Sequence, residues 1–385
     1  MKKTLKELLP SLEKEGLEYK IVQDPGSPLL EECIIEDLAF DSRKVTKNSL
    51  FFALPGTHTS GNRFVKDAIE AGASAIVFEG DFSAEEREEL AKYPSKATFI
   101  QVKSSRFAMS PLSASFYDNP SQKLVIYGVT GTEGKSSTVS FIWQLLTLCG
   151  LKAGFISTVQ YSLGGPAINN PEHQTTPEAP IVQKELYQML ENGCTHAVVE
   201  SSSHGLSSKT NRLGNVEFDV AVFTNVTLEH LEFHKTFDQY RSDKANLFRA
   251  LDKYDHKKTI SGLVTQVPSI GIVNLEDPSA SYFAACTKKK VFGFTSEGKA
   301  GSAKALPEIP ADMPYLAARN IVSARYGMSF SIYRFENHDS LQNGNRVIHV
   351  KAPVAGAFNA YNIMAAMLAV SATTGKRLED LASLL

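Results

Sequence analysis

Apolar residues along the chain fall into short runs of β-forming residues that alternate with longer stretches at helical spacing. The clearest unit starts with the apolar run at residues 124–127, which predicts a buried parallel strand. A glycine-rich segment follows, and from Val139 to Cys149 apolar side chains recur at helical spacing until Gly150, a residue typical of a helix end. The pattern therefore predicts a strand, a glycine loop and a helix within residues 124–150.

The same alternation predicts a small α/β domain at the start of the chain, over residues 1–107. Its expected helix lies at residues 61–71, and its expected strands lie at residues 34–40, 49–54, 74–78 and 97–102. A helix at residues 105–117 is expected to connect this domain to the glycine-loop unit.

The remainder, residues 108–385, predicts a second and larger domain. Expected strands lie at residues 153–159, 195–199, 218–223 and 269–273, and expected helices at residues 178–192, 237–251 and 358–374. Shorter alternating runs at residues 329–335 and 346–350 predict antiparallel strands, and residue 377 starts another helix. Strands alternating with helices are typical of an α/β fold with a doubly wound, mostly parallel sheet.

Composition and charge add that this is an ordinary soluble protein. Its 385 residues, 43% hydrophobic and 21% charged, suffice for two or three domains with substantial cores. A net charge of −2 gives no reason to expect nucleic acid or an anionic membrane as a partner. The four cysteines lack metal-ligand spacing, and the sequence has neither a signal peptide nor a long apolar run. We therefore expect a cytoplasmic protein with reduced thiols.

The glycine loop predicts phosphate binding. Gly128, Gly131 and Gly134 recur at a spacing of three, and Lys135 and Ser136 follow directly. Glycines let backbone N–H groups approach an anion, and the helix N-terminus adds partial positive charge. The lysine reaches the β- and γ-phosphates of a nucleotide, and the serine hydroxyl ligates Mg²⁺. The strict G-x-x-x-x-G-K-[ST] pattern is not met, because position 129 is Val, but the strand and helix around the loop favour ATP with Mg²⁺.

Polar residues also follow two later strands. Glu200 ends the apolar run at residues 197–199, and His230 and His234 follow the strand at residues 218–223. Because ligands bind at the carboxyl ends of strands in open α/β sheets, we expect Glu200 near the glycine loop as a metal ligand. His230 is as consistent with a metal or phosphate contact as with a structural role, whereas the structural role is favoured for His234.

Four further positions have a structural interpretation, and the first three have a functional one as well. The stretch Thr175-Thr176-Pro177 is a helix-entry signal that could equally place hydroxyls on a substrate. Asp41-Ser42-Arg43 is more typical of a turn than of a ligand contact. Ser202 suits a helix cap or a substrate contact. Lys244, on its residue type and position alone, is interpreted as a helix-surface lysine in a weak ion pair.

Taken in order, these motifs resemble the Mur ligase family, and most of all its members that add the third residue to the cell-wall peptide. The resemblance is carried by residues 128–137, 175–177, 200–204, 223–234 and 240–244. Residues 38–43 and 56–64 resemble the family's uridine-nucleotide domain, and residues 356–362 its adenine-side segment. The resemblance covers nearly the whole chain.

The resemblance implies an ATP-dependent ligase that adds a diamino acid to the D-glutamate of UDP-N-acetylmuramoyl-L-alanyl-D-glutamate through an acyl phosphate, in peptidoglycan synthesis. It implies a monomer with a UDP-sugar-binding domain at residues 1–107 and a central P-loop ATPase-like domain at residues 108–385. The implied substrate contacts are Ser42, Thr175, Thr176, Ser202 and Arg212, the last if a small insertion after His204 is allowed.

The resemblance also implies the ATP and metal residues. The implied ATP contacts are Gly131, Thr132, Glu133, Gly134, Lys135, Ser136, Ser137, Asn274, Asp277 and Asn359. The implied magnesium ligands are Ser136, Glu200, His230 and Lys244, with Lys244 converted by carbamylation into a carboxylate-like group. Lys135, Lys244, His230 and Glu200 are the implied catalytic residues.

The sequence departs from the family pattern in several places. Glu133 replaces the usual Asn, and its charge should weaken ATP binding unless the side chain faces solvent. Ser136-Ser137 and Glu229 are milder replacements of Thr-Thr and Asp. Family members continue into a C-terminal Rossmann-like domain that selects the incoming amine, so we expect this chain to be a truncated, inactive form.

Two other functions remain as alternatives. A folylpolyglutamate-synthase-like ligase shares the glycine loop, but that relative lacks the uridine-nucleotide domain that residues 38–43 resemble. A non-catalytic module that binds a UDP-sugar or ATP is favoured by the expected truncation and by Glu133.

Overall fold

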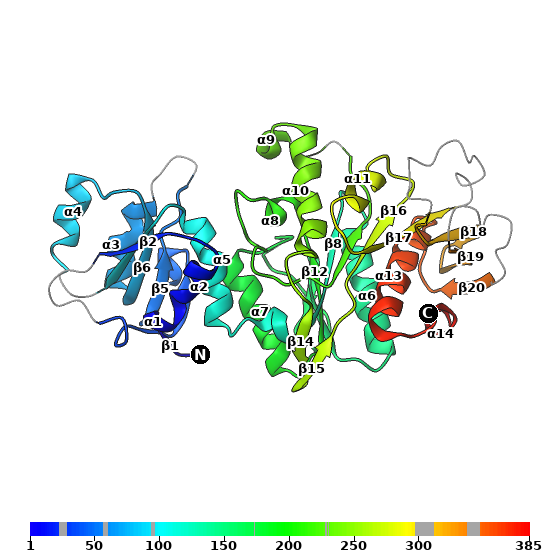
Figure 1. Cartoon of the computed structure of the whole chain (residues 1–385), viewed down its shortest axis with the longest axis horizontal. Helices are drawn as coiled ribbons and strands as arrows, with labels where there is room; N and C mark the ends of the chain where they lie inside the picture. The colour runs from blue at the N-terminus through cyan, green and yellow to red at the C-terminus, as the bar shows by residue number, and fades with distance from the viewer. Residues whose placement is uncertain are drawn as a thin grey trace. The chain divides into compact units, whose positions relative to one another are not determined.

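A computed structural model describes residues 1–22, 29–56, 61–93, 97–172, 174–227, 229, 231–296, 312–336 and 347–385. The chain divides into two compact units. The N-terminal unit comprises residues 1–120, 178–184 and 208–216, and the central unit comprises residues 121–177, 185–207 and 217–385. Both units are layered α/β structures (Figure 1). None of the helices in these ranges is both long and apolar enough to cross a membrane.

The N-terminal unit is built on a five-stranded sheet in the order β2-β7-β6-β5-β4. Its strands are β2 (Tyr19–Val22), β4 (Asp37–Ala39), β5 (Ser49–Phe52), β6 (Ala73–Glu79) and β7 (Thr98–Val102). Only the edge strand β2 runs antiparallel to its neighbour; the other pairs are parallel. The helices are α1 (Leu5–Leu8), α2 (Pro10–Lys14), η1 (Ser42–Lys44), η2 (Gly61–Phe64), α3 (Val65–Glu70), α4 (Ala84–Leu90) and α5 (Ser105–Phe116).

The predicted strand at residues 34–40 is broken in two. Its first part, β3 (Ile34–Ile35), pairs with β1 (Lys3–Thr4) in a separate two-stranded sheet, whereas β4 joins the five-stranded sheet. One hydrophobic run thus contributes a strand to each of two sheets. The alternation of apolar and polar residues along the run does not predict this break. The predicted helix at residues 61–71 likewise begins as the 3₁₀ turn η2 before it becomes α3.

The central unit contains an eleven-stranded sheet in the order β11-β10-β9-β12-β8-β13-β16-β17-β18-β19-β20. Its parallel strands are β9 (Ala153–Ile156), β12 (His196–Glu200), β8 (Val125–Thr130), β13 (Val220–Phe223), β16 (Ile270–Asn274), β17 (Lys290–Ser296) and β18 (Tyr315–Ala324). Antiparallel strands extend both edges: β10 (Gln160–Ser162), β11 (Ile168–Asn169), β19 (Gly327–Phe335) and β20 (Val347–Ala352). The doubly wound α/β fold predicted from the sequence is thereby confirmed.

Helices cover both faces of this sheet. They are α6 (Lys135–Leu148), α8 (Ser203–Leu206), α9 (Leu231–His234), α10 (Phe237–Ala250), α11 (Ala280–Ala284), α13 (Asn359–Thr374) and α14 (Leu378–Ala382), together with most of α7 (Ala179–Glu191), and η3 (Pro120–Lys123) precedes β8. Successive side chains of β8 point to opposite faces. The hydroxyl of Tyr127 is hydrogen-bonded to Oγ1 of Thr373 in α13, whereas a Cβ on Gly128 would meet Leu247 of α10. The helices α13 and α10 therefore lie on opposite faces of the sheet.

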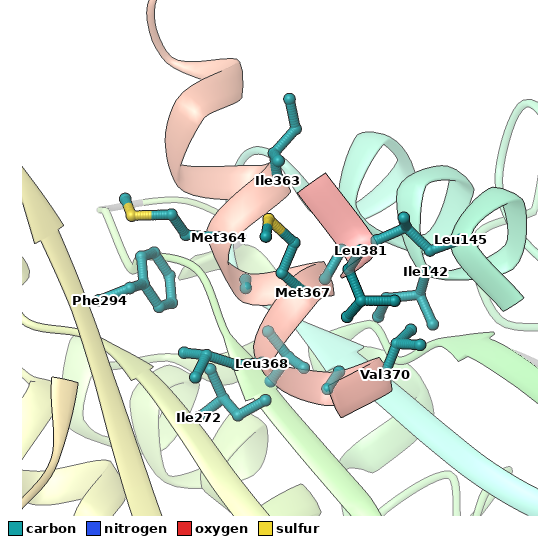
Figure 2. Close-up of a cluster of buried hydrophobic side chains, with 14 of the residues drawn as sticks. Ile142, Leu145, Ile272, Phe294, Ile363, Met364, Met367, Leu368, Val370 and Leu381 are labelled. Carbon is teal, nitrogen blue, oxygen red and sulfur yellow. The ribbon is translucent and has the colours of Figure 1, made fainter. Parts of the chain in front are cut away.

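The largest hydrophobic cluster lies between α13, α6 and the sheet (Figure 2). Ile363, Met367 and Val370 of α13 pack with Ile142 and Leu145 of α6, and the strands below contribute further side chains. Burying a side chain of this size contributes about 1.5–3 kcal/mol. This cluster fixes α6, and with it the end of the glycine loop.

A buried charge cluster anchors a hairpin at the amino end of β13. Lys258 of β14 (Lys257–Ile260), which pairs with β15 (Leu263–Gln266), places Nζ 2.6 Å from Oδ2 of Asp219. Nδ1 of His256 lies 3.0 Å from Oδ1 of the same carboxylate, and the backbone N–H of Ile126 donates to Oδ2 at 2.8 Å. Buried charges persist only when they are paired and hydrogen-bonded in this way.

Candidate functional site

The glycine loop lies between β8 and α6 and leaves no room for a side chain at Gly131 or at Gly134. A Cβ on Gly131 would lie 1.9 Å from Oγ1 of Thr224. Gly134 has a φ of +79°, and a Cβ there would lie 2.8 Å from Oδ1 of Asn362. The residues predicted from their spacing as a phosphate loop therefore form a tight strand-to-helix turn, the geometry that presents N–H groups to an anion.

The residues after β13 hold the backbone of this loop. Oγ1 of Thr224 donates to the carbonyl of Glu133 at 2.6 Å, and Oδ1 of Asn225 accepts from the N–H of Glu133 at 2.9 Å. The carbonyl of Asn225 accepts from the N–H of Thr132 at 2.8 Å. The Glu133 side chain itself is exposed, which is the condition under which we expected its charge to be tolerated.

Asn274 and Asp277 support the same segment from below. Nδ2 of Asn274 donates to the carbonyl of Thr224 at 2.8 Å, and Oδ2 of Asp277 accepts from the N–H of Val226 at 2.7 Å. Both side chains are therefore hydrogen-bonded to the backbone of the segment that braces the glycine loop. The sequence resemblance had implied nucleotide contacts for them.

Glu200 is the hub of the site. Its side chain is almost fully buried, with 1% of the residue exposed, at the carboxyl end of β12. Oε2 accepts from Oγ of Ser136 at 2.9 Å and from Oγ of Ser157 at 2.6 Å, and Thr158 donates to both carboxylate oxygens. The structure thus brings Glu200 to the start of α6, where the order of parallel strands placed it.

Two lysines converge on the loop. Nζ of Lys135 donates to the carbonyl of Thr132 at 2.7 Å, and Nζ of Lys244 donates to the carbonyl of Gly131 at 2.6 Å. Burial lowers the pKa of Lys135. Burial, reinforced by the charge of Lys135, lowers the pKa of Lys244 well below its ordinary value. The interpretation of Lys244 as a surface lysine is wrong, because α10 packs this residue inward until only 2% of it is exposed.

The threonines of the helix-entry segment lie beside Glu200. Oγ1 of Thr175 lies 2.9 Å from Oγ1 of Thr158, within hydrogen-bond distance. Oγ1 of Thr176 donates to the carbonyl of Glu200 at 2.8 Å and accepts from the N–H of Ser202 at 3.0 Å. Oγ of Ser202 caps α8 by accepting from the N–H of Gly205. These three predicted substrate residues share one network around the β12 terminus.

His234 is a structural residue. Its Nδ1 lies 2.7 Å from Oδ2 of Asp243 and its Nε2 lies 3.0 Å from Oγ of Ser203, so both ring nitrogens are engaged inside the unit. His230, the other candidate histidine, lies outside the described residues. So do residues 57–60, which belong to the stretch 56–64 that resembles the family's uridine-nucleotide domain.

The remaining predicted residues lie at two other places. In the central unit, Oδ1 of Asn359 accepts from Nδ2 of Asn362, whose side chain lies close to Gly134 in space. Ser137 lies in the first turn of α6. In the N-terminal unit, Ser42 opens the 3₁₀ turn η1, which Asp41 caps. Arg212, also in that unit, pairs with Glu178.

Sequence reasoning missed the residues that position the others: Ser157, Thr158, Thr224, Asn225, Tyr240 and Asn362. Thr224 and Asn225 directly follow a predicted strand, so the rule that identified Glu200 could have found them. Oγ1 of Thr132 lies 3.2 Å from the hydroxyl of Tyr240, a contact between residues 108 positions apart that has no local signal.

The side-chain oxygens of Ser136 and Glu200 at the start of α6 suit a magnesium ion as ligands. Ser136 and Glu200 offer a hydroxyl and a carboxylate oxygen within 2.9 Å of each other, and oxygen is the ligand that Mg²⁺ prefers. Within the ranges that the structure covers, no three His, Cys, Asp or Glu side chains form a ready-made metal site. Any ion here must take further oxygens from other groups, such as phosphates or water.

Two protein-family models match the chain. The Mur ligase middle domain matches residues 129–370, and the catalytic domain of the Mur ligase family matches residues 35–117. Among curated relatives, the UDP-N-acetylmuramyl-tripeptide synthetase of Treponema denticola is 48% identical over 356 residues. The UDP-N-acetylmuramoyl-L-alanyl-D-glutamate–2,6-diaminopimelate ligase of Geobacillus kaustophilus is 33% identical over 349 residues. Each alignment covers 90% of this chain, which spans 62% of the length of either relative.

Solved structures share the fold. A UDP-N-acetylmuramoyl-L-alanyl-D-glutamate–2,6-diaminopimelate ligase superposes with a TM-score of 0.69 at 20% identity, covering all of this chain and 66% of that one. The MurF ligase of Thermotoga maritima in complex with ADP superposes with a TM-score of 0.54 at 18% identity, covering 90% of this chain and 65% of that one.

Proposed function

Because the chain belongs to the Mur ligase family, we propose that it forms the nucleotide-sugar and ATP-binding part of a ligase that extends UDP-N-acetylmuramoyl-L-alanyl-D-glutamate by a diamino acid. The observation that carries the proposal is the convergence of Lys135, Lys244 and Glu200 on one glycine loop. The names of the curated relatives, tripeptide synthetase and diaminopimelate ligase, support the choice of substrate.

The proposed reaction needs positioning and charge neutralisation rather than a protein nucleophile. The γ-carboxylate of the D-glutamate attacks the γ-phosphate of ATP, ADP leaves, and an acyl phosphate forms. The amino group of the diamino acid then attacks the acyl carbon and expels phosphate. The loop N–H groups that Asn225 does not engage, together with Lys135, offset negative charge on the transferring phosphoryl group. Ser136 and Glu200 are the residues that would hold a magnesium ion, which supplies further charge neutralisation when bound.

Lys244 is proposed to act as a carbamate. A buried lysine with a lowered pKa is more often the neutral amine, and the neutral amine is the form that adds carbon dioxide. Its Nζ would lose a proton and gain a carboxylate, so a group that now donates to the carbonyl of Gly131 would become an oxygen ligand. The carbamate would also place a negative charge beside Lys135, whose positive charge helps to lower the pKa of the Lys244 amine.

Calorimetric titration tests the proposal directly. We expect the chain to bind UDP-N-acetylmuramoyl-L-alanyl-D-glutamate at least tenfold more tightly than UDP, and to bind ATP with Mg²⁺. In the whole ligase, sustained release of ADP and phosphate should require both the muramoyl dipeptide and a diamino acid. Equal affinity for UDP and the full substrate, or tighter binding of a folate, would refute the assignment and favour another ligase or a binding module.

A further inference from the structure

Thr130, the last residue of β8, has a buried hydroxyl without a hydrogen bond. None of the residue is exposed, and its Oγ1 has no partner within the part of the chain that the structure describes. Buried hydroxyls are hydrogen-bonded in the great majority of cases, because an unpaired one has given up its bond to water. Valine has nearly the same shape and would fill this position without that loss. The Thr130 hydroxyl therefore points to a partner that the described residues do not supply.

The pleat of β8 turns this side chain toward α10. Successive residues of a strand point to opposite faces of the sheet. The hydrophobic cluster that includes α13 and α6 contains the odd-numbered residues of the strand, Val125, Tyr127 and Val129. Gly128 and Thr130 therefore face the other side. A Cβ on Gly128 would lie 2.4 Å from Cδ1 of Leu247, so α10 covers that side.

On this face α10 brings Lys244 to Thr130. Leu247 lies opposite Gly128, and one helical turn earlier Nζ of Lys244 donates to the carbonyl of Gly131 at 2.6 Å. The helix thus runs antiparallel to β8 between these two contacts. Of the two strand residues between Gly128 and Gly131, only Thr130 faces α10. Its hydroxyl and the Lys244 side chain therefore share one buried space.

Lys244 has few partners for a buried lysine. Lys258, a second buried lysine of the same unit, donates to the Asp219 carboxylate and to two backbone carbonyls, which engages all three of its N–H groups. Nζ of Lys244 makes one hydrogen bond within the described ranges, to Gly131. A buried amine with so few acceptors is more favourable without its charge, and the neutral amine is the form that reacts with carbon dioxide.

We propose that the Thr130 hydroxyl positions the carbamate of Lys244, an inference that rests on the carbamate of the proposed function. The lone pair of the neutral amine bonds to the carbon of CO₂, and one N–H proton leaves to solvent. The product keeps one N–H and gains one negative charge. That N–H still donates to the carbonyl of Gly131, while Oγ1 of Thr130 donates to one carbamate oxygen. Two adjacent residues thereby fix the plane of the carbamate, and its other oxygen stays available as a metal ligand.

The test is carbon-13 NMR of the full chain, titrated at fixed pH with bicarbonate labelled with carbon-13. Lys244→Gln identifies the carbamate signal, which this variant should lack. T130V removes the hydroxyl and keeps the shape, so we expect half-carbamylation to need about tenfold more bicarbonate, as for the loss of one hydrogen bond to a charged group. T130S keeps the hydroxyl and should stay within about twofold of the wild type.

A matched control and a second readout separate positioning from a structural role. T98V makes the same change at a fully buried threonine of β7, in the N-terminal unit, and should leave the carbamylation curve unchanged. Without bicarbonate, T130V should not lower the urea midpoint, because the hydroxyl that it removes has no bond in the unmodified chain. A purely structural role predicts the reverse, a lower midpoint with unchanged carbamylation.

A T130V variant that forms the carbamate at wild-type bicarbonate concentrations would overturn the inference, as would a T130S variant no better than T130V. Absence of a carbamate signal from the wild type would refute the carbamate of Lys244 itself, and the role of Thr130 with it. Each of these results is distinct from failure of the substrate assignment, which titration with the muramoyl dipeptide measures separately.

Discussion

Among single residues, burial decides what each ionisable side chain of this protein can do. The spacing of glycines identified Lys135, whereas Lys244 resembled any surface lysine because its contact with the carbonyl of Gly131 joins residues 113 positions apart. Both lysines have a lowered pKa, and burial is the main cause. Composition could not have indicated this, since solvation depends on the neighbours that the fold supplies.

Glu185 gives a pH-dependent prediction at this scale. Burial raises its pKa from 4.5 to about 7. A raised pKa means that its stabilising contribution is complete below pH 4.5 and is lost as the pH rises through 7. E185Q should therefore match the wild type at low pH and exceed it above neutrality, by roughly 2–3 kcal/mol in the free energy of unfolding.

Urea denaturation of both proteins at acidic and alkaline pH measures this difference. E191Q changes an exposed carboxyl of the same helix and should show no pH-dependent difference from the wild type. A stability difference for E185Q that is the same at every pH would contradict the expected titration.

At the scale of elements, the site lies where the carboxyl ends of β8, β12 and β13 are adjacent. The rule that parallel strands present their carboxyl ends at one edge was enough to bring Glu200 to the glycine loop. It did not reveal that the residues after β13 hold the loop backbone, or that Asn362 of α13 closes against Gly134. Such contacts depend on which helix packs where, and the local pattern does not encode that choice.

Gly131→Ala tests the bracing of the loop. The added Cβ would meet Oγ1 of Thr224, so either the loop or the segment after β13 must shift. We expect at least a tenfold loss of ATP affinity and a destabilisation of about 1–3 kcal/mol, as for other overpacked sites. Gly165→Ala, at a glycine with open space around it, is the control. Unchanged ATP binding by Gly131→Ala would show that the loop is not the nucleotide site.

Over the whole molecule, the sequence predicted the α/β class and most central strands but missed β17, β18 and the β14–β15 hairpin. The stretch Tyr315–Ala324 contains good helix formers such as Leu316 and Ala317, yet it forms a strand because β17 and β19 pair with it on both sides. The hairpin is held by the buried Lys258, which no local pattern distinguishes from an exposed lysine.

The division into two units predicts separable defects. Ser42→Ala should weaken binding of the UDP-linked substrate several-fold and leave ATP affinity unchanged, since Ser42 lies in the N-terminal unit. Lys135→Ala should weaken ATP binding at least tenfold and leave UDP binding unchanged. Each variant serves as the control for the other, and titration with the two nucleotides measures both. A shared defect in either variant would contradict the separate assignment of the two ligands.

The charge cluster below β13 has a consequence for the timing of local opening. The amide of Ile126 in β8 is held by the side chain of Asp219, the same carboxylate that grips Lys258 of the hairpin. The Ile126 amide proton can exchange with solvent deuterium only when its hydrogen bond to the Asp219 carboxylate breaks. Neighbouring β8 amides exchange only when a paired strand separates from β8. The rate of hydrogen exchange at this one amide therefore reports how often the β14–β15 hairpin detaches. The detachment takes place at the end of β8 that lies away from the glycine loop.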